Sequence, residues 1–429
     1  MLSVNEAEKL IQERVKPLPP EKHPLGGLLG RVLAEDILAD RDQPPWAQSA
    51  MDGYAVRSEE TRGASAEHPV EAALMGEVAA GEMAVEPVSS GSACRIMTGA
   101  PVPPGSDSVV PLEYTREEQG QVLIFRSVKE GENIRPKAED FGENQVVLNK
   151  GMVLNSGAVG LIAAAGRAEA LVYTQPRVGV LATGNELTEP GEAAGEGQIR
   201  NSNSYALQAQ IQEAGGEAWL LGIARDHAES VRSLILEGIG ADMLLISGGV
   251  SVGKYDTVKE TLSQLGAEPV FWRVAIKPGG PLAFWMLEGK PVFGLPGNPV
   301  STMVTFEEFV RPVIREMAGH RILGRPMIEG VLLEPFTKKP GKTVFARVRV
   351  SRKNGRYHVR SSGIQSSGAL KTMAMANGLM VVPAASGSLE AGAVVSVRLL
   401  DDWAWWLDEE TEGFSESGGG GVWIRSGKT

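Results

Sequence analysis

The sequence predicts a multidomain protein that combines an α/β domain with β-rich domains, and three observations predict it. Strands and helices alternate over about residues 177–322, short apolar runs separated by Gly and Pro fill residues 44–148, and a hairpin signal lies at Asn354-Gly355. At 429 residues the chain exceeds what a single hydrophobic core usually serves, and roughly 150 residues per domain gives about three units.

The N-terminal stretch predicts a helix. Ser3 and Glu6 form a capping-box pattern, and apolar residues recur at helical spacing from Val4 to Val15, which predicts a helix over residues 3–16. Residues 155–170 are again helical in pattern and rich in small side chains. The β-rich segment between them therefore reads as an insertion into a helical region.

The α/β segment begins with the apolar run at 177–184 and continues with helical patterns at 201–215, 227–239 and 255–266, separated by strands at 217–223 and 241–249. This alternation predicts a mostly parallel, doubly wound sheet that is covered on both faces. A further helix begins near Ser301. In the C-terminal segment Val344, Ala346, Val348 and Val350 alternate before the Asn354-Gly355 turn, which predicts a β unit.

We accordingly divide the chain into segments: residues 1–43 and 149–176 as an elongated helical and linking domain, 44–148 as an inserted β module, 177–322 as the α/β domain, 323–401 as the C-terminal β domain, and 402–429 as an acidic, Trp- and Gly-rich tail whose end we expect to be flexible.

Composition excludes several classes of function. Cys94 is the single cysteine, so an internal disulfide framework and a cysteine zinc site within one chain are excluded, and the five histidines lack metal-ligand spacing. The net charge of -11 disfavours nucleic acid and anionic lipid as partners. No apolar run is long enough to span a membrane and the N-terminus has no signal pattern, so we expect a cytoplasmic protein that binds small molecules and holds any metal through oxygen.

The segment Ser247-Gly248-Gly249 follows a buried strand at 243–246 and precedes a helix. Successive glycines let backbone N–H groups converge on an anion, and the helix dipole favours a phosphate there. The segment matches neither GxxxxGK[ST] nor GxGxxG, which argues against nucleoside triphosphates and dinucleotides. By itself it is equally consistent with a tight turn that uses glycine for its geometry.

Other glycine-containing loops follow apolar runs at 183–186, 277–281 and 295–299, and we expect all of these loops to gather at one edge of one sheet. They carry Glu186, Asp256 and Lys277. Two carboxylates near phosphate-binding backbone suit Mg²⁺, and a lysine suits an oxyanion. Each charge alone is also typical of a solvated surface.

In the β module, acids, a threonine and an arginine lie beside glycine turns at 50–55, 95–101 and 133–140. Asp52, Thr98, Arg135 and Asp140 are the candidates. Spacing leaves open whether the two acids only cap turns through their own backbone.

Over nearly all of residues 1–400 the sequence resembles the molybdopterin molybdenumtransferase family, which includes the bacterial MoeA proteins and the E domain of gephyrin. The resemblance is carried by ordered blocks: SAMDGYAV at 49–56, RIMTGAPVPPG at 95–105, NIRPKAED at 133–140, ATGNEL at 182–187, SGGVSVGKYD at 247–256, IKPGGP at 276–281 and GLPGNPVS at 294–301. It implies a MogA-like, molybdopterin-binding α/β domain and a C-terminal β-barrel domain.

The resemblance implies an enzyme of molybdenum cofactor biosynthesis that inserts molybdenum from molybdate into adenylylated molybdopterin, with Mg²⁺, and releases AMP. Two alternatives stay open: a tungstate-using homologue, and a non-catalytic pterin-binding or scaffold protein. Retention of Asp256, Lys277 and Glu186 favours catalysis, because a scaffold does not need them.

The resemblance also implies residue roles. Asp256 and Glu186 would hold Mg²⁺ or water, Lys277 would stabilise phosphate charge, and Asp226 matches a family acid. Ser301, Arg347 and Ser367 match positions that resemble a molybdate-binding surface. The remaining expected cofactor-binding residues are Thr183, Gly184, Ser247, Gly248, Gly249, Ser251, Gly253, Pro296, Gly297, Asn298 and Pro299.

The family resemblance further implies a homodimer with a composite active site, in which Asp52, Thr98, Arg135 and Asp140 of one chain face the α/β domain of the other. Transient contacts with the molybdopterin adenylyltransferase and with acceptor apo-enzymes would follow from the reaction. One departure concerns Gly280, where the family commonly has a second lysine. We expect either that Lys254 or Arg273 substitutes for it or that molybdate binds more weakly.

Overall fold

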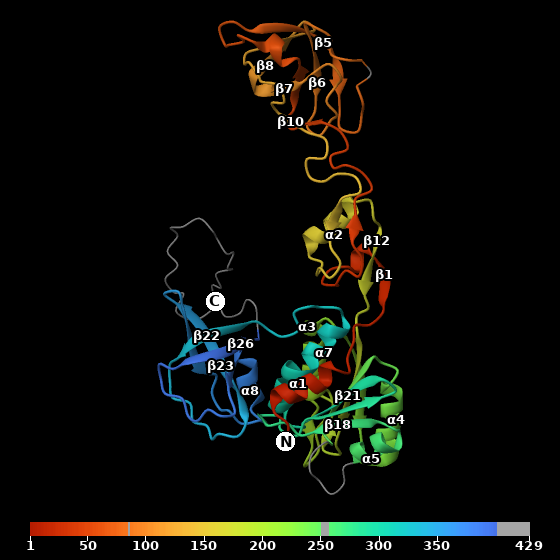
Figure 1. The fold of residues 1–429 in the computed structure, drawn as a ribbon, viewed down its shortest axis with the longest axis vertical. Coiled ribbons are helices and arrows are strands. Elements are labelled where there is room, and N and C mark those ends of the chain that lie inside the picture. The colour runs from red at the N-terminus through yellow and green to blue at the C-terminus, as the bar shows by residue number, and fades with distance from the viewer. Residues whose placement is uncertain (85, 250–256, 401–429) are drawn as a thin grey trace. The chain divides into compact units, whose positions relative to one another are not determined.

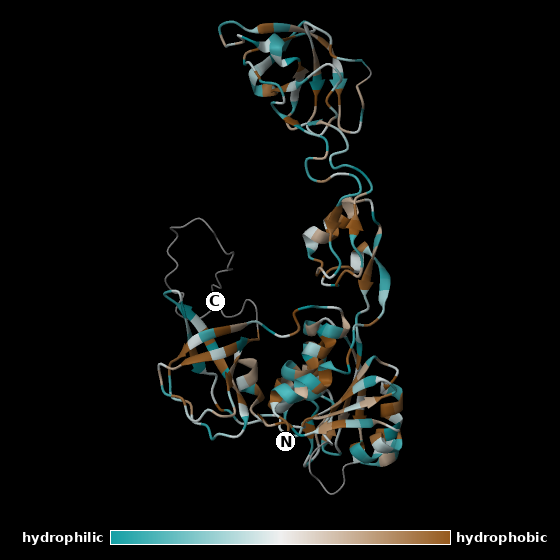
Figure 2. Ribbon diagram, viewed as in Figure 1, coloured by the Kyte–Doolittle hydropathy of each residue, from teal (hydrophilic) through white to brown (hydrophobic). Residues whose placement is uncertain are grey.

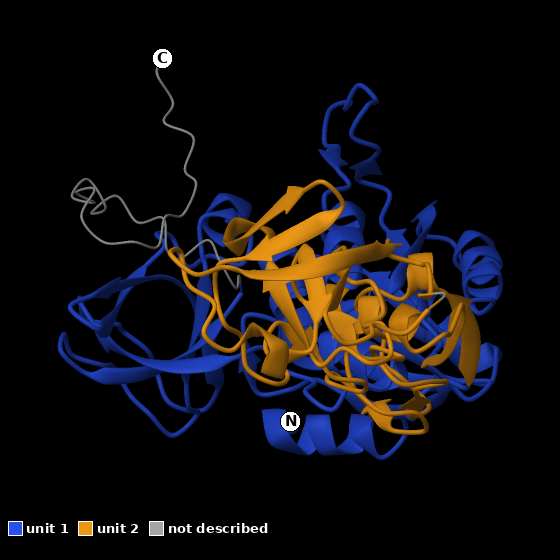
Figure 3. Ribbon diagram, turned by 90° about the horizontal axis from the view of Figure 1, so that it is seen from above, with its two compact units in different colours: residues 1–19, 173–429 blue, residues 20–172 orange. Residues whose placement is uncertain are grey.

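The structure is a computed structural model that describes residues 1–84, 86–249 and 257–400. It divides into two compact units, Met1–Pro19 with the chain from Tyr173 onward, and Pro20–Val172 (Figure 3). The finer domain boundaries predicted from the sequence stay predictions. Ser251, Gly253, Lys254, Asp256 and the tail 402–429 lie outside the described residues.

The first unit contains a sheet with the strand order β16-β13-β17-β21-β20-β18 (Figure 1). The four strands from β16 to β21 are parallel, whereas β20 and β18 are antiparallel additions at one side. The mostly parallel sheet is therefore confirmed. The strands are β13 (Arg177–Thr183), β16 (Glu217–Ala224), β17 (Met243–Ser247), β18 (Glu268–Trp272), β20 (Ala283–Leu287) and β21 (Lys290–Leu295).

Helices cover both faces of this sheet. One face packs against α1 (Val4–Gln12), α3 (Asn203–Ala214), α6 (Pro299–Thr305) and α7 (Arg311–Met317), and the other against α4 (Ala228–Gly238) and α5 (Thr257–Gln264). Along β17, Met243 and Leu245 enter the first core while Leu244 and Ile246 enter the second. A strand buried on both faces has to be apolar throughout, and Figure 2 shows the apolar residues concentrated in the strands.

Helix α1 forms as its sequence pattern predicts. The Ser3 Oγ accepts from the Glu6 N–H, and the Glu6 carboxylate accepts from the Ser3 N–H at 2.7 Å, which completes the capping box. Its apolar face packs into the core of the α/β sheet and not with residues 20–43. The sequence periodicity identifies the buried face of a helix, but it does not identify what that face packs against.

The helix predicted near Ser301 begins at Pro299 and continues through α6 and α7, with a π-helical turn at Phe306–Val310 between them. Pro312 lies in the first turn of α7 and has no N–H to donate, which accounts for the changed hydrogen-bond pattern just before it. The turn carries two buried acids, Glu307 and Glu308.

The C-terminal strands close into a barrel, in which β23 pairs with both β24 and β25, and β22 and β26 complete the ring. Its strands are β22 (Met327–Leu332), β23 (Thr343–Lys353), β24 (Arg356–Ser361), β25 (Gly378–Val382) and β26 (Val394–Leu399), with α8 (Leu370–Ala374) beside them. The expected hairpin is present, because Lys353 pairs with Arg356 around Asn354 (φ 52°) and Gly355 (φ 78°).

The second unit contains the inserted sheet with the order β7-β4-β6-β5-β9-β8. Its strands are β4 (Gly53–Val56), β5 (Val70–Val78), β6 (Ser92–Ile96), β7 (Ser108–Pro111), β8 (Thr115–Glu118) and β9 (Gln121–Ile124). Short strand pairs flank it: β1 (Pro20–Pro24) with β12 (Glu169–Tyr173), β2 (Ile37–Leu38) with β11 (Val146–Leu148), and β3 (Gln48–Ser49) with β10 (Ile134–Arg135).

The region predicted as helical within this unit contains one α-helix, α2 (Ser156–Ala164), and is otherwise made of short strands and turns. Asn155 caps α2 by accepting from the Ala158 N–H at 2.8 Å. Among the described residues, none of the helices combines the length and apolar character needed to cross a bilayer.

Candidate active site

The carboxyl ends of β13, β17 and β21 bring three glycine-containing loops together, as predicted from the sequence. The Asn203 side-chain amide, at the start of α3, donates to Ser247 Oγ at 2.8 Å and to the Gly297 carbonyl at 2.9 Å. One residue therefore joins the loop after β17 to the loop after β21. No sequence motif singles out Asn203, since an asparagine at a helix start is ordinarily a cap.

The loops after β13 and β17 touch through backbone that only glycine allows. Gly248 (φ 92°) and Gly249 (φ 65°) have left-handed backbone, and a Cβ on Gly248 would lie 2.7 Å from the Thr183 carbonyl oxygen. A Cβ on Gly249 would lie 2.6 Å from Thr183 Oγ1. That hydroxyl is buried and has no hydrogen-bond partner among the described residues. A buried polar atom without a partner at a strand end is consistent with a ligand-binding edge.

One backbone amide of the expected phosphate loop and one of the loop after β13 donate to carbonyls at neighbouring strand ends. The Gly248 N–H donates to the Leu295 carbonyl at 3.1 Å, and the Gly184 N–H donates to the Ala224 carbonyl at 3.1 Å. The Gly248 N–H is thus paired with the neighbouring strand end, and its role toward a phosphate stays a prediction. The same glycine closely approaches Thr183.

Asp226, at the end of β16, anchors the loop that carries Glu186. The Asn185 N–H donates to Asp226 Oδ2 at 3.1 Å, and the Asp226 N–H donates to Asn185 Oδ1 at 3.1 Å. Arg225 Nη1 donates to the Leu187 carbonyl at 3.0 Å and holds the other end of this loop. The family acid Asp226 thus has a structural partner.

Oxygen donors suited to Mg²⁺ occur at this edge. Glu186 is exposed and its carboxylate folds back toward Gly184, while Asp226 lies on the adjoining strand end. Carboxylates of this kind fit a hard cation that shares its sites with substrate phosphates. Within the part of the chain that the structure describes, no group of three or more acids, histidines or cysteines could hold a metal.

The start of α6 links this edge to the barrel. Thr302 Oγ1 donates to the carbonyls of Pro296 and Asn298 and so shapes the turn before Pro299. The Val300 N–H donates to the Ser367 carbonyl at 3.1 Å. The predicted residues Ser301 and Ser367 therefore lie on segments that are hydrogen-bonded to each other, although each comes from a different domain.

Lys277 lies on a strand of a different sheet from the one expected. Its strand β19 (Ile276–Lys277) pairs in parallel with β23 of the barrel and is not a strand of the α/β sheet. A Cβ on Gly279 would lie 2.3 Å from Thr305 Cγ2, so the loop after β19 packs on α6. The expectation that this loop follows a strand of the α/β sheet is wrong, because a strand of two residues does not show its partner in the sequence.

Comparisons with known proteins agree with this arrangement. Residues 2–166 match the MoeA N-terminal region (domain I and II), residues 179–316 a probable molybdopterin binding domain, and residues 329–400 the MoeA C-terminal region (domain IV). The molybdopterin molybdenumtransferase of Staphylococcus aureus strain COL is 35% identical over 401 residues, which are 93% of this chain and 96% of the relative. The chain belongs to the molybdopterin molybdenumtransferase family.

Other relatives of this family point the same way. The enzyme of the same name from Staphylococcus epidermidis is 33% identical over 93% of this chain and 96% of its own length. The crystal structure of a molybdopterin biosynthesis MoeA protein from Pyrococcus horikoshii has a TM-score of 0.79 and 31% identity, and it covers 94% of this chain and 100% of that one. As a family member the chain is an enzyme, a transferase of molybdenum cofactor biosynthesis.

In the family's barrel domain Arg347 is completely buried. Its Nε donates to Thr372 Oγ1 at 3.0 Å, and its Nη2 donates to the carbonyls of Ile364 (2.8 Å) and Ser366 (3.1 Å). Burial lowers the pKa of this guanidinium. Arg347 therefore shapes the loop that carries Ser367, while its Nη1 has no partner among the described residues.

A cavity of about 750 Å³ lies between β19 and the start of β23. Its charged lining residues are all basic: Lys277, Lys338, Lys339, Lys342 and Arg347. The Lys338 ammonium donates to the carbonyls of Pro383 and Ser386 and is buried, so it serves the fold. The KKPGK run at 338–342 is visible in the sequence, but nothing in the sequence places it beside Lys277.

In the second unit the structure brings Asp52 and Thr98 together. Asp52 Oδ1 accepts from the Thr98 N–H and from Thr98 Oγ1, both at 2.7 Å, and these bonds lower the pKa of Asp52. Both side chains are exposed.

Backbone contacts place the motif at residues 133–140 beside the turn that carries Asp52. The Ala50 N–H donates to the Asn133 carbonyl at 2.9 Å, and Arg135 pairs with Gln48 across β10 and β3. Asp140 is held through its N–H, which donates to the Gln43 carbonyl at 3.0 Å. Arg135 and Asp140 are exposed, and the three motif segments of the β module meet through backbone, with Asp52 and Thr98 in side-chain contact.

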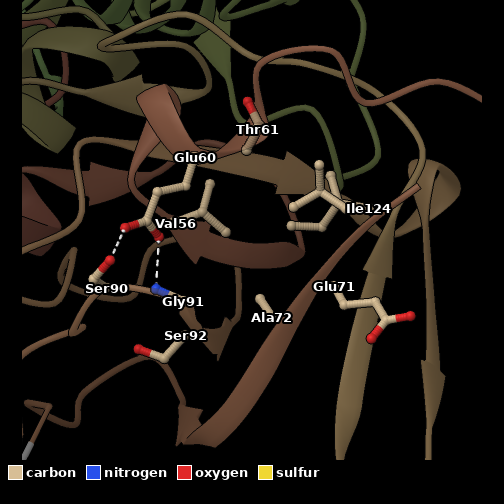
Figure 4. A pocket seen from close by; sticks show the side chains of 10 residues that line it. Val56, Glu60, Thr61, Glu71, Ala72, Ser90, Gly91, Ser92 and Ile124 are labelled. Carbon is tan, nitrogen blue, oxygen red and sulfur yellow. Dashed lines mark hydrogen bonds between the residues drawn. The ribbon is translucent and has the colours of Figure 1, made fainter. Parts of the chain in front are cut away.

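Another cavity in this unit, of about 320 Å³, contains none of the predicted site residues (Figure 4). Its Glu60 accepts from Ser90 Oγ at 2.6 Å and from the Gly91 N–H at 2.9 Å. That acid anchors a loop of the β module.

Proposed function

We propose that the chain transfers molybdenum from molybdate to adenylylated molybdopterin and releases AMP. The observation that carries this proposal is the junction at Asn203, where glycine-containing loops from parallel strand ends meet beside α6 and the barrel. Such strand ends are where open α/β sheets bind phosphate-bearing ligands. The barrel side adds buried and exposed cations suited to a tetrahedral oxyanion.

The two substrates would occupy neighbouring parts of this site. The pterin phosphate would lie against the loops at 183–184, 247–249 and 296–299, and molybdate would lie toward Lys277, Ser301 and Ser367. Water would attack the phosphoanhydride, so that AMP leaves and a phosphate stays on the pterin. The two dithiolene sulfurs would bind molybdenum in place of oxygen ligands of molybdate, which leave as water with the thiol protons. Mg²⁺, held by Glu186 and by Asp256 or Asp226, would offset charge on the phosphates. Lys277 would stabilise the oxyanion charge that develops.

We further propose a homodimer in the cytoplasm with a site composed from two chains. Asp52 and Thr98, with Arg135 and Asp140, would then face the α/β domain of a second copy. These exposed polar side chains have the character of a surface that serves a ligand rather than a core. The adenylyltransferase that supplies the substrate and the apo-enzymes that accept the product are the expected transient partners.

The purified full chain, incubated with adenylylated molybdopterin, molybdate and Mg²⁺, tests the proposal. We expect AMP release, followed by chromatography, and activation of an apo-molybdoenzyme by the product. Binding of the pterin without AMP release would indicate a pterin-binding or scaffold protein instead. Parallel reactions with tungstate decide between the two oxyanions through the ratio of kcat/KM.

A further inference from the structure

Lys342 occupies the space beside Gly280, the position where the family resemblance leads one to expect a second lysine. The Lys342 Nζ lies 3.9 Å from the point where a Gly280 Cβ would be. The other neighbours of that point are the carbonyl oxygens of Ile276 at 3.6 Å and Val274 at 3.7 Å. The ammonium of Lys342 thus lies in van der Waals contact with the point at which a side chain at position 280 would begin.

Sheet pairing places Lys342 there. Strand β19 pairs with β23 in the register Ile276 with Thr343 and Lys277 with Val344, and the Thr343 N–H donates to the Ala275 carbonyl at 2.9 Å. Lys342 directly precedes β23, so this register sets it beside the loop that follows Lys277. The two lysines are 65 residues apart in the chain and lie on the rim of one cavity.

The surroundings of Lys342 favour an anion. Among the described residues, no acid lines the cavity, and both Lys277 and Lys342 line it and are exposed. Arg347, also in its lining, is completely buried and its Nη1 has no partner among the described residues. A buried guanidinium nitrogen without a partner is costly unless a ligand or water completes it.

We propose that Lys342 is an oxyanion-binding residue that works with Lys277 and supplies the cation that Gly280 does not. The ligand is a tetrahedral dianion, and the inference rests on the proposed function only in taking molybdate as that dianion. Of the substitutes expected from the sequence, Arg273 is not among the residues that line the cavity, and Lys254 lies outside the described residues. A lysine at position 280 would begin in contact with the Lys342 ammonium, and two neighbouring cations repel each other.

Calorimetric titration of the full chain with molybdate, at low ionic strength and without the pterin, tests this inference. We expect Lys342→Ala to weaken binding about tenfold, since a charge-assisted contact is lost. Gly280→Lys alone should change affinity by less than about twofold, and Gly280→Lys combined with Lys342→Ala should restore most of the loss. Lys342→Arg should keep most of the affinity.

Lys339→Ala is the matched control. It removes the same charge from the same loop, but Lys339 is not among the nearest neighbours of Gly280. An equal loss in Lys339→Ala and Lys342→Ala would overturn the inference, since it would show a general field rather than a local contact. The inference would also be overturned if Lys342→Ala bound molybdate as tightly as the wild type, or if the wild type bound no molybdate. A double variant that melts like the wild type but recovers no affinity would overturn it as well. AMP release is measured separately, so binding with the expected pattern but without turnover would refute the proposed function and leave this inference standing.

Discussion

The side-chain amide of Asn203 donates to Ser247 Oγ at 2.8 Å and thereby joins helix α3 to the end of strand β17. The same amide also reaches the Gly297 carbonyl. One donor group thus sets the spacing between two loops that are expected to share a ligand. Substitution of Asn203 therefore tests whether this junction between the two loops is needed for turnover.

We expect Asn203→Asp to lower the free energy of unfolding by about 1–2 kcal/mol and to reduce AMP release at least tenfold, because the carboxylate cannot donate to the Gly297 carbonyl. Gln212→Glu is the matched control, since it makes the same chemical change at an exposed position of the same helix. Thermal denaturation and the AMP assay measure both effects. Equal activity in the two variants would contradict the role of the junction.

Gly248→Ala should be destabilising by about 1–3 kcal/mol, because φ is 92° and the new Cβ would meet the Thr183 carbonyl oxygen at 2.7 Å. Gly297→Ala is its control. The nearest atom to a Cβ there is 3.8 Å away, so that variant should melt close to the wild type. Differential scanning calorimetry compares the two, and a similar Tm for both would show that the approach of Gly248 to Thr183 is not tight.

Glu308 should make stability depend on pH. It is buried in the π-helical turn, 2.8 Å from Arg398, and burial raises its pKa to about 8 although Arg398 opposes the shift. In the unfolded chain this carboxyl has a pKa of 4.5, which is lower than in the folded chain. Its contribution to the stability of the fold is therefore fully present below pH 4.5 and is lost as the pH rises through about 8.

Denaturant unfolding from pH 5 to 9 measures this dependence. The wild type should lose on the order of a few kcal/mol relative to Glu308→Gln across that range, since the glutamine never ionises. Glu329→Gln, at an exposed position on β22, should follow the wild type. Parallel curves for the wild type and Glu308→Gln would show that Arg398 keeps this acid ionised.

The composite site can be tested by mixing two inactive variants. Asp52→Asn damages the second unit and Lys277→Ala damages the first, so a dimer with one chain of each would contain one site with both residues intact. Random reassortment after mild denaturation should restore about a quarter of the wild-type AMP release. A mixture no more active than its separate components would place both residues in one chain's site.

The fold was largely predictable from local patterns. Met243 to Ile246 had to be a strand buried on both faces because all of them are apolar, and the Asn354-Gly355 turn specified its hairpin because both residues accept positive φ. The extent of helix in residues 20–43 and 149–172 was overestimated. Small apolar residues suit a helix and a short strand equally well, and pairings such as β1 with β12 depend on residues nearly 150 positions apart.

The site was predictable only in part. Thr183, Ser247 and Gly297 came together as expected because parallel strands end at the same edge of a sheet. The partner strand of Lys277 and the position of Lys342 were not predictable, since β19 has two residues and pairs with a strand in another domain. Asn203 looked like a helix cap, and its partners lie 44 and 94 residues away.

The sequence by itself determined which segments are strands and helices, which loops carry glycine, and which family the ordered motifs resemble, because these depend on neighbours along the chain. The tertiary structure alone decided that Gly248 approaches Thr183 while its N–H pairs with Leu295, that Arg347 is buried in the barrel, and that Lys342 lies beside Gly280. These are contacts between distant segments. Their free energy depends on register and packing, and a one-dimensional pattern carries no distance between such segments.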